Sequence, residues 1–208
     1  MKKAILVALF SLLMASTAFA VQLLPGTFGV ATTGTAAPDG ILEASIIDAP
    51  FTGIDANGVV TFTGTLNQWV YSNSTGMLFT YLFSSDSSSI NVIQRLSTTD
   101  YAGWTTDVDS LQTEGNPWPL SFERSVDGTT VSGAHYVMAQ GKTSSLLWIQ
   151  TNAPSYGWGS TSLIDGGIAN IGTYAPSAAV PEPGTMMLLG TGLLGMIGYG
   201  KVRFGKKA

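Results

Sequence analysis

The fold is decided by one alternating stretch, which reads Val59-Val60-Thr61-Phe62-Thr63-Gly64-Thr65-Leu66-Asn67-Gln68-Trp69-Val70-Tyr71. Its apolar positions are Val60, Phe62, Leu66 and Val70, and polar residues stand between them. A period of two residues is typical of a β-strand with one face against a core and the other toward solvent. We therefore interpret this stretch as a long strand of an antiparallel sheet.

Short runs of β-branched and aromatic residues recur on both sides of this strand, with turn residues between them. The predicted strands are 41–47, 59–71, 77–83, 90–96, 104–111, 121–126, 129–138, 145–151 and 162–174. Asp127-Gly128 is a hairpin turn signal, and Asn57-Gly58 opens the long strand from a turn. Because no helical pattern intervenes, the sequence predicts an all-β fold, an antiparallel β-sandwich of jelly-roll-like form.

The first twenty residues have the pattern of a secretory signal peptide. A basic start at Lys2 and Lys3 is followed by an apolar run over 4–14, and Ala18 and Ala20 are the small residues that a signal peptidase reads. The run is short for a membrane span, which argues against a retained anchor or a buried core helix. We expect residues 1–20 to be removed, so that the mature chain begins at Val21.

A second apolar segment, 185–200, precedes a basic tail at 201–208. This pattern predicts a transmembrane helix, and the positive-inside rule places the tail in the cytoplasm. The expected organisation is therefore an exported β-sandwich domain at 21–174, a linker at 175–184, the helix and the tail. None of the glycines in the helix stand four apart, so we infer no dimer from it.

The linker contains Val180-Pro181-Glu182-Pro183, which the two prolines hold extended. Followed by a Gly-rich apolar helix and a basic end, it resembles the PEP-CTERM sorting signal of exported bacterial proteins. The resemblance implies that Pro181, Glu182 and Pro183 are recognition residues for exosortase, an integral-membrane cysteine protease or transpeptidase. It further implies a Gram-negative bacterium that makes extracellular polysaccharide or biofilm matrix. The helix would anchor the protein in the membrane before processing, after which it reaches the cell surface or the matrix.

The domain between the two ends is acidic and carries few charges. Residues 21–180 hold three basic side chains against twelve acidic ones, a net charge of −9, whereas the whole chain has −4. Such a domain is repelled by phosphate backbones, which argues against nucleic-acid binding. The absence of cysteine from the sequence excludes disulfides, a thiol nucleophile and a lipoprotein anchor.

Catalytic signals are weak, and we interpret the domain as non-catalytic, with no catalytic residues assigned. The one histidine, His135, falls in a predicted strand, and no Gly-x-Ser-x-Gly motif accompanies it. A structural histidine is the simpler interpretation. Paired carboxylates of a glycan hydrolase remain an alternative, because Glu43, Glu114, Glu123 and nine aspartates are available.

No metal site and no cofactor is predicted, and the alternative that the acidic residues offer is calcium. Oxygen ligands cluster at Asp107-Val108-Asp109, Asp55-Ala56-Asn57-Gly58 and Asp165-Gly166-Gly167. None of these fits the Asp-x-Asp-x-Asp-Gly loop, and such clusters are typical of turns.

The five tryptophans are the better indication of a binding role. Sugar rings stack on flat aromatic faces, and Trp104, Trp118 and Trp158 are the candidates for sugar stacking. Trp158 stands among glycines in Tyr156-Gly157-Trp158-Gly159, whereas Trp69 and Trp148 are expected in the core. The sequence thus indicates an exported, exosortase-sorted surface or matrix protein associated with exopolysaccharide. The alternatives are a carbohydrate-binding module, a structural component with buried indoles, or a glycan hydrolase.

Overall fold

The computed structural model describes residues 21–178, where all regular structure is β-strand. The strands are β1 (Val21–Gln22), β2 (Val30–Ala31), β3 (Ile41–Ile54), β4 (Val60–Ser72), β5 (Met77–Ser85), β6 (Arg95–Thr98), β7 (Thr106–Ser110), β8 (Ser121–Arg124), β9 (Val131–Ala134), β10 (Leu147–Thr151), β11 (Ser155–Ile164) and β12 (Ile168–Ser177). They form one antiparallel sheet in the order β1-β7-β10-β5-β4-β3-β12-β11-β6-β9-β8-β2. The predicted all-β, antiparallel class is confirmed.

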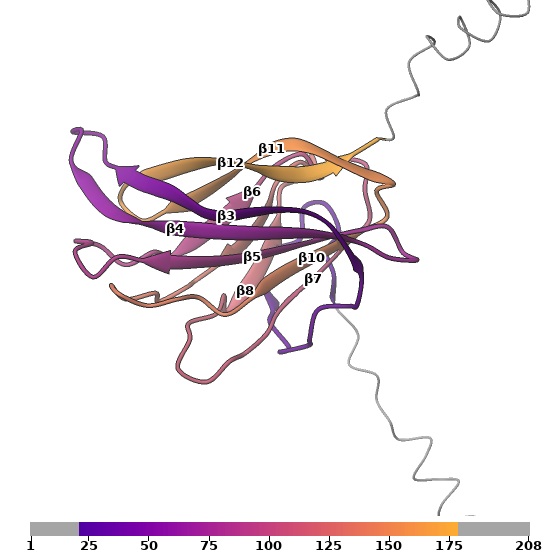
Figure 1. Ribbon diagram of the computed structural model, residues 1–208, viewed down its shortest axis with the longest axis horizontal. Helices are drawn as coiled ribbons and strands as arrows, with labels where there is room; N and C mark the ends of the chain where they lie inside the picture. Colours follow the sequence, from indigo (N-terminus) through magenta and orange to yellow (C-terminus); the bar gives the residue numbers. More distant parts are fainter. Residues whose placement is uncertain (1–20, 179–208) are drawn as a thin grey trace, which may run out of the picture. The chain divides into compact units, whose positions relative to one another are not determined.

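The sheet curls on itself until it is nearly a barrel. Figure 1 shows β3, β4 and β5 side by side, with the hairpin of β11 and β12 above them. The two halves of the sheet are joined by a single residue pair, Ile54 of β3 with Ile168 of β12. The two outer edges are bridged by the segment between β1 and β2. The Leu23 N–H donates to the Thr106 carbonyl of β7 over 2.7 Å, and the Thr27 carbonyl accepts the Arg124 N–H of β8 over 2.8 Å. The predicted sandwich of separate sheets is therefore not confirmed, because hydrogen bonds make one sheet of both halves.

The core lies inside the curled sheet and follows the alternation of β4. Phe62, Leu66 and Val70 are fully buried, and Phe79 and Phe83 of the neighbouring strand β5 lie beside Val70 and Leu66 on the same face of the sheet. Burying a side chain of this size contributes roughly 1.5–3 kcal/mol relative to leaving it exposed. Packing of apolar side chains thus supplies the main stabilisation of this cysteine-free domain.

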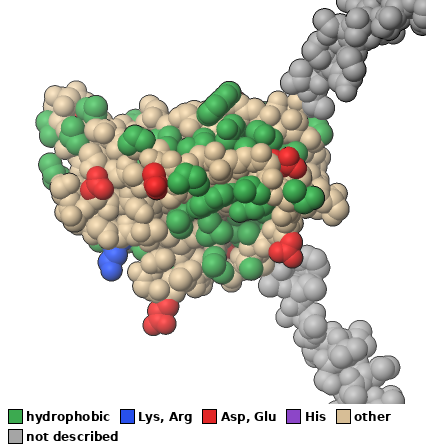
Figure 2. All heavy atoms as spheres, in the orientation of Figure 1, with side chains coloured by type: hydrophobic (Ala, Val, Ile, Leu, Met, Phe, Trp, Pro, Cys, Tyr) green, Lys and Arg blue, Asp and Glu red, His purple; other side chains and the backbone are tan. Residues whose placement is uncertain are grey.

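The outer face of the sheet is partly apolar as well. Figure 2 shows hydrophobic side chains gathered on the face that β3, β4 and β5 present, with a few carboxylates around them. Ile41, Leu42 and Ile47 of β3 are among the exposed ones. Exposed apolar residues of this kind are common in folded proteins.

Both predicted turns are present. The Gly58 N–H donates to the Asp55 carbonyl over 3.1 Å between β3 and β4, and the Gly128 N–H donates to the Ser125 carbonyl over 2.9 Å between β8 and β9. Both glycines have a positive φ, 82° and 73°, a conformation that side chains with a Cβ rarely adopt. The turn signals in the sequence therefore reported the local geometry correctly.

The predicted single strand over 162–174 is wrong. The structure has a hairpin there, in which β11 and β12 turn at Asp165-Gly166-Gly167, with the Asp165 N–H donating to the Gly167 carbonyl over 3.0 Å. Asp165-Gly166-Gly167 is itself a turn signal, and it divides the predicted strand into the two strands of the hairpin. Strand β12 also extends to Ser177, past the expected end of the domain at residue 174.

Several predictions fall outside the described residues. These are the signal peptide at 1–20, most of the linker, the helix at 185–200 and the tail at 201–208. Within 21–178 no helix is long and apolar enough to cross a membrane.

Candidate functional site

Three aromatic side chains, Tyr156, Trp158 and Tyr174, form an aromatic platform on the hairpin of β11 and β12. Trp158 and Tyr174 stand directly opposite each other across the two strands, with ring centroids 4.8 Å apart and planes 31° apart. Tyr156 meets Tyr174 edge-on at 5.2 Å. The indole of Trp158 is 74% exposed, so it offers a flat aromatic face to a ligand.

The interior of the sheet holds this platform in place. Gln68 of β4 is fully buried and clamps Tyr174: its Oε1 accepts the backbone N–H over 2.7 Å, and its Nε2 donates to the carbonyl over 2.7 Å. Gly159, next to Trp158, leaves no room for a Cβ, which would lie 2.5 Å from the Ala175 Cβ. The exposed indole thus stands on a rigid, closely packed hairpin. This favours binding, because the platform loses little conformational entropy when a ligand binds.

The other predicted stacking residues are less open. Trp104 is half-buried, and its carbonyl accepts a hydrogen bond from Arg124 Nη2 over 3.0 Å. Trp118 is also half-buried and lines a hollow of about 200 Å³ with Leu120 and Val137. Trp158 is therefore the most exposed of the three.

The two tryptophans expected in the core behave differently from each other. Trp148 is buried as predicted, but on the outer side of the sheet, where its Nε1 donates to the Thr35 carbonyl over 2.9 Å. Trp69 is only half-buried, so its assignment to the core is wrong. It alternates with the core residue Val70 and therefore points to the outer side of β4.

His135 does not lie in a strand, contrary to the prediction. Strand β9 ends at Ala134, and His135 follows it exposed, with a φ of 59°. It lines a hollow of about 230 Å³ with Gln94, Arg95 and Asp165, and it also lines the hollow beside Trp118. Burial raises the pKa of the Asp165 carboxyl in the first of these.

Among the acidic clusters considered for calcium, the carboxylate of Asp55 already accepts hydrogen bonds from its own turn. Asp55 accepts the N–H groups of Val59 and Asn57 over 2.8 and 2.9 Å, and these bonds, that of Val59 foremost, lower its pKa. Burial raises the pKa of Asp107. No group of three or more His, Cys, Asp or Glu side chains in residues 21–178 is arranged to hold a metal ion.

Asp109 binds a segment that the sequence analysis did not connect with it. Its carboxylate accepts the N–H groups of Thr33, Gly34 and Thr35 over 3.0, 3.2 and 2.9 Å. Burial raises its pKa, but hydrogen bonds from Thr33, Thr35 and Ser110 outweigh this effect and leave the pKa below the ordinary value. Its role in the structure is thus to fasten residues 33–35 to β7.

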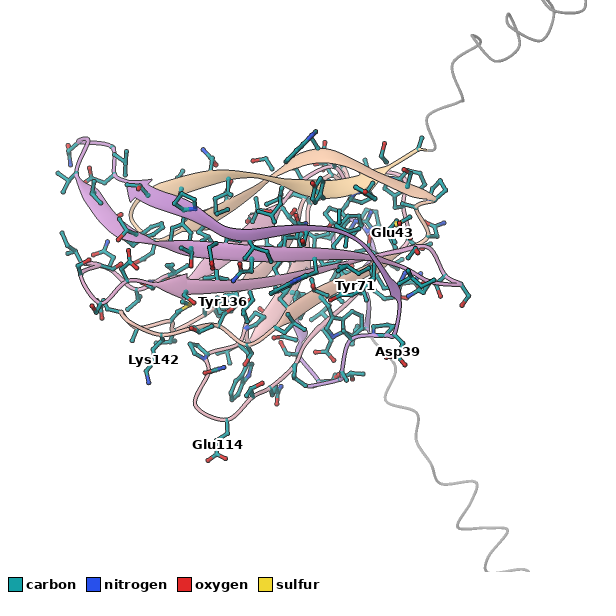
Figure 3. The ribbon with its side chains drawn as sticks, in the orientation of Figure 1. Asp39, Glu43, Tyr71, Glu114, Tyr136 and Lys142 are labelled. Atoms are coloured by element: carbon teal, nitrogen blue, oxygen red, sulfur yellow. The ribbon has the colours of Figure 1, made fainter. Side chains whose placement is uncertain are left out.

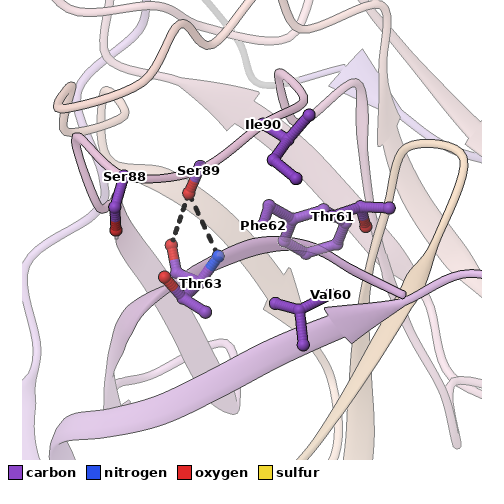
Figure 4. Close-up of a pocket in the computed structure, with 7 residues that line it drawn as sticks. All are labelled: Val60, Thr61, Phe62, Thr63, Ser88, Ser89 and Ile90. Carbon is purple, nitrogen blue, oxygen red and sulfur yellow. Dashed lines mark hydrogen bonds between the residues drawn. The ribbon is translucent and has the colours of Figure 1, made fainter. Parts of the chain in front are cut away.

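A further small hollow, of about 130 Å³, opens between the start of β4 and residues 88–90 (Figure 4). Its polar wall is occupied by local bonds, since Ser89 Oγ accepts the Thr63 N–H over 3.0 Å and donates to the Thr63 carbonyl over 3.1 Å. These groups fix a loop, so the hollow offers little to orient a ligand.

Comparison with protein families finds one match, the PEP-CTERM protein-sorting motif at residues 179–202, which includes Pro181, Glu182 and Pro183. The motif defines a class: an exported protein that is anchored at the membrane and processed by exosortase. Within that class, the chain is a PEP-CTERM domain-containing protein with a β-rich exported domain. Neither a curated protein nor a solved structure matches it.

Proposed function

We propose that the β domain of this exosortase-sorted protein is a non-catalytic module that associates with extracellular polysaccharide at the cell surface or in the biofilm matrix of a Gram-negative bacterium. The observation that carries the proposal is the aromatic platform, with its rigidly held and 74% exposed Trp158. The sorting motif supports it, because it resembles that of proteins made together with such polymers. Signal peptidase and exosortase are then the processing partners.

The chemistry of the platform suits a sugar. One face of a pyranose ring is lined with C–H groups, which pack on an indole, while its hydroxyls need polar neighbours. Ser160 and Ser162 follow Trp158 on the same side of β11, and a Cβ added to Gly172, opposite Ser160, would meet no atom within 4 Å. A ligand therefore has a flat stacking surface, open space beside it and hydroxyl groups to bond. This binding requires no cofactor.

The arrangement of the glutamates supports a binding role over hydrolysis. Figure 3 shows Glu114 at the tip of a loop, well separated from Glu43 at the end of the sheet. Glu123 is paired with Arg95 over 2.8 Å. A glycosidase needs two carboxyl groups flanking one bond, about 5–10 Å apart, and Glu43 and Glu114 do not provide them.

The proposal is tested by a polysaccharide-binding assay on the exported domain, residues 21–178, which has its own core. Trp158→Ala is expected to weaken binding at least tenfold, about 1.4 kcal/mol, without lowering the melting temperature. Ile90→Ala is the matched control, because Ile90 is a 67% exposed apolar residue outside the platform. Absence of binding to every polymer, including that of the producing cells, would refute the proposal.

A further inference from the structure

A row of polar side chains crosses five strands on the outer face of the sheet. Its members are direct cross-strand partners, and they are Asn170 of β12, Ser162 of β11, Ser97 of β6, Ser132 of β9 and Glu123 of β8. Ser162 Oγ donates to Asn170 Oδ1 over 2.6 Å, and the hydroxyls of Ser97 and Ser132 are 2.7 Å apart. The chain neighbours Leu96, Leu163 and Phe122 belong to the core, so the row faces outward.

The row runs into a hollow of about 470 Å³, which is larger than the three hollows at His135, Trp118 and Ser89. Ser97, Ser132 and the ion pair of Arg95 with Glu123 line it, and apolar walls rise at Phe28, Val126 and Ile164. Phe28 and Val126 are 65% and 79% exposed, so their apolar surfaces are open to a ligand. A concave surface with apolar walls and a few fixed polar groups is typical of a ligand site.

This hollow continues into the two hollows at His135. It shares Arg95 and Ile164 with the hollow at Asp165, which in turn shares His135 with the hollow beside Trp118. The three hollows therefore adjoin one another along the ends and the outer face of β6, β8 and β9, and together we call them the groove. A groove of this extent fits a chain better than it fits a single small molecule.

Donors and acceptors remain available in the groove. Arg95 uses one contact for Glu123, and a guanidinium carries further N–H donors. The bonded hydroxyls of Ser97 and Ser132 leave one O–H and several lone pairs unused.

We propose that this polar row and its groove bind a linear, uncharged polysaccharide that lies across the strands. The row repeats at the strand spacing of about 4.8 Å, close to the length of one sugar unit in an extended chain, and it spans about 19 Å from Asn170 to Glu123. The aromatic platform lies on the same side of β11, with Trp158 about 13 Å from Ser162 along the strand. Because the row runs across the strands and the platform lies along β11, one unbranched polymer that stacks on the platform and hydrogen-bonds along the row has to turn near Ser162.

The charges of the groove select an uncharged ligand. The positive charge of Arg95 is matched by Glu123, Asp165 lines the adjoining hollow, and residues 21–180 carry a net charge of −9. A polyuronate chain would meet repulsion along most of this surface. A hydroxyl-rich chain instead finds alternating donors and acceptors.

The inference rests on the proposed polysaccharide binding, and calorimetry on residues 21–178 separates the two. The probes are disaccharides and linear hexasaccharides of glucose, mannose and galactose, with an oligouronate as the charged counterpart. Arg95→Met is expected to weaken hexasaccharide binding about tenfold and disaccharide binding little, because a short ligand needs only the platform. Lys142→Met is the matched control, since it removes the same charge from a loop that lacks these contacts (Figure 3).

Each outcome decides a different claim. Suppose that Arg95→Met and the milder Ser97→Ala bind the hexasaccharide as tightly as wild type, whereas Trp158→Ala binds it more weakly. The proposal that the groove binds the polymer would then be overturned, and the proposed polysaccharide binding would be upheld. Binding of the oligouronate in preference to the uncharged chains would overturn the proposed ligand class. Absence of binding by the wild-type domain to any of these probes would overturn both proposals.

Discussion

Arg124 is buried, and its guanidinium binds four backbone carbonyl oxygens rather than a carboxylate in the described structure. It donates to Leu23, Tyr101, Trp104 and Gly128 over 2.9, 2.7, 3.0 and 3.1 Å. Burial lowers its pKa. One side chain thus ties the N-terminal segment, the loop before β7 and the turn after β8 together.

Replacing Arg124 by methionine is expected to destabilise the domain by about 3 kcal/mol or more, because these carbonyls lose their donors inside the protein. Arg124→Lys is expected to recover only part of the loss, since an ammonium has fewer donors. Urea unfolding of residues 21–178 measures the change, with Lys142→Met as a control within about 0.5 kcal/mol of wild type. Equal stability of Arg124→Met and wild type would contradict this role.

Asp127 is expected to make the stability of the hairpin between β8 and β9 depend on pH. Its pKa is lowered to about 2, first by the Ser125 hydroxyl and then by the backbone and hydroxyl of Thr129. A lowered pKa in the folded state stabilises the protein above the unfolded value of 3.8, and this contribution disappears as the pH falls toward 2. Asp127→Asn should therefore lower the melting temperature at neutral pH and approach wild type near pH 2.

Melting temperatures between pH 2 and pH 6 check this, with Glu114→Gln as the control. Glu114 stands at the tip of an exposed loop (Figure 3), so its replacement is expected to leave the curve unchanged. A constant difference between Asp127→Asn and wild type over the whole range would show that the carboxylate charge is not responsible.

The segment at 33–35 is an added layer on the outer side of β7 and β10. Asp109 accepts its three N–H groups, and Trp148 donates to the Thr35 carbonyl. Asp109→Asn replaces one acceptor oxygen by a donor, so it is expected to cost about 1–3 kcal/mol. Hydrogen exchange should show faster exchange at the amides of Thr33, Gly34 and Thr35.

Asp107→Asn is the matched control for this element. Asp107 lies two residues away on the same strand, and burial raises its pKa, so a neutral side chain is tolerated there. The contribution of Asp109 is present above pH 3.8 and is lost as the pH falls below it, because its pKa in the folded state lies below the ordinary value. Unchanged exchange at 33–35 in Asp109→Asn would mean that other contacts hold the segment.

The sequence predicts the individual strands better than their assembly. The alternation of β4 and the glycines at 58 and 128 are local signals, and local geometry follows from them. The closure through residues 23–27, by contrast, depends on hydrogen bonds to Thr106 and Arg124, far along the chain, which no local pattern encodes. The same holds for the coverage of Trp148 by Thr35.

Only part of the candidate site could be predicted from the sequence, because local patterns do not encode which strands pair. Trp158 stood out because of its flanking glycines, and its exposure is confirmed. Its partner Tyr174, and the alignment of Ser97 with Ser132, depend on the strand register. Register is set by turns and core packing together. The undivided strand predicted over 162–174 therefore hid the pairing of Trp158 with Tyr174, and the pairing of β6 with β9 joins segments far apart in the chain.

At the scale of the whole molecule, the folded domain and its sorting signal are close neighbours in the chain. Strand β12 is still paired at Ser177, opposite Ser155, and the sorting motif begins at residue 179. Only three residues, 178–180, separate Ser177 from Pro181 in the chain. A processing enzyme that reads Pro181-Glu182-Pro183 therefore acts within a few residues of the last paired residue of the sheet.

Export and sorting should leave a mature protein without either hydrophobic end. Its intact mass, measured on material from the producing cells, is expected to correspond to a chain that starts at Val21 and lacks residues 185–208. Glu182→Ala removes the charged residue between the two prolines and should cause the unprocessed form to accumulate, whereas Glu114→Ala removes the same charge from an exposed loop and should be processed normally. Wild-type protein that retains residues 185–208 at steady state would instead identify the segment as a permanent anchor, and the exported domain would then act only at the membrane.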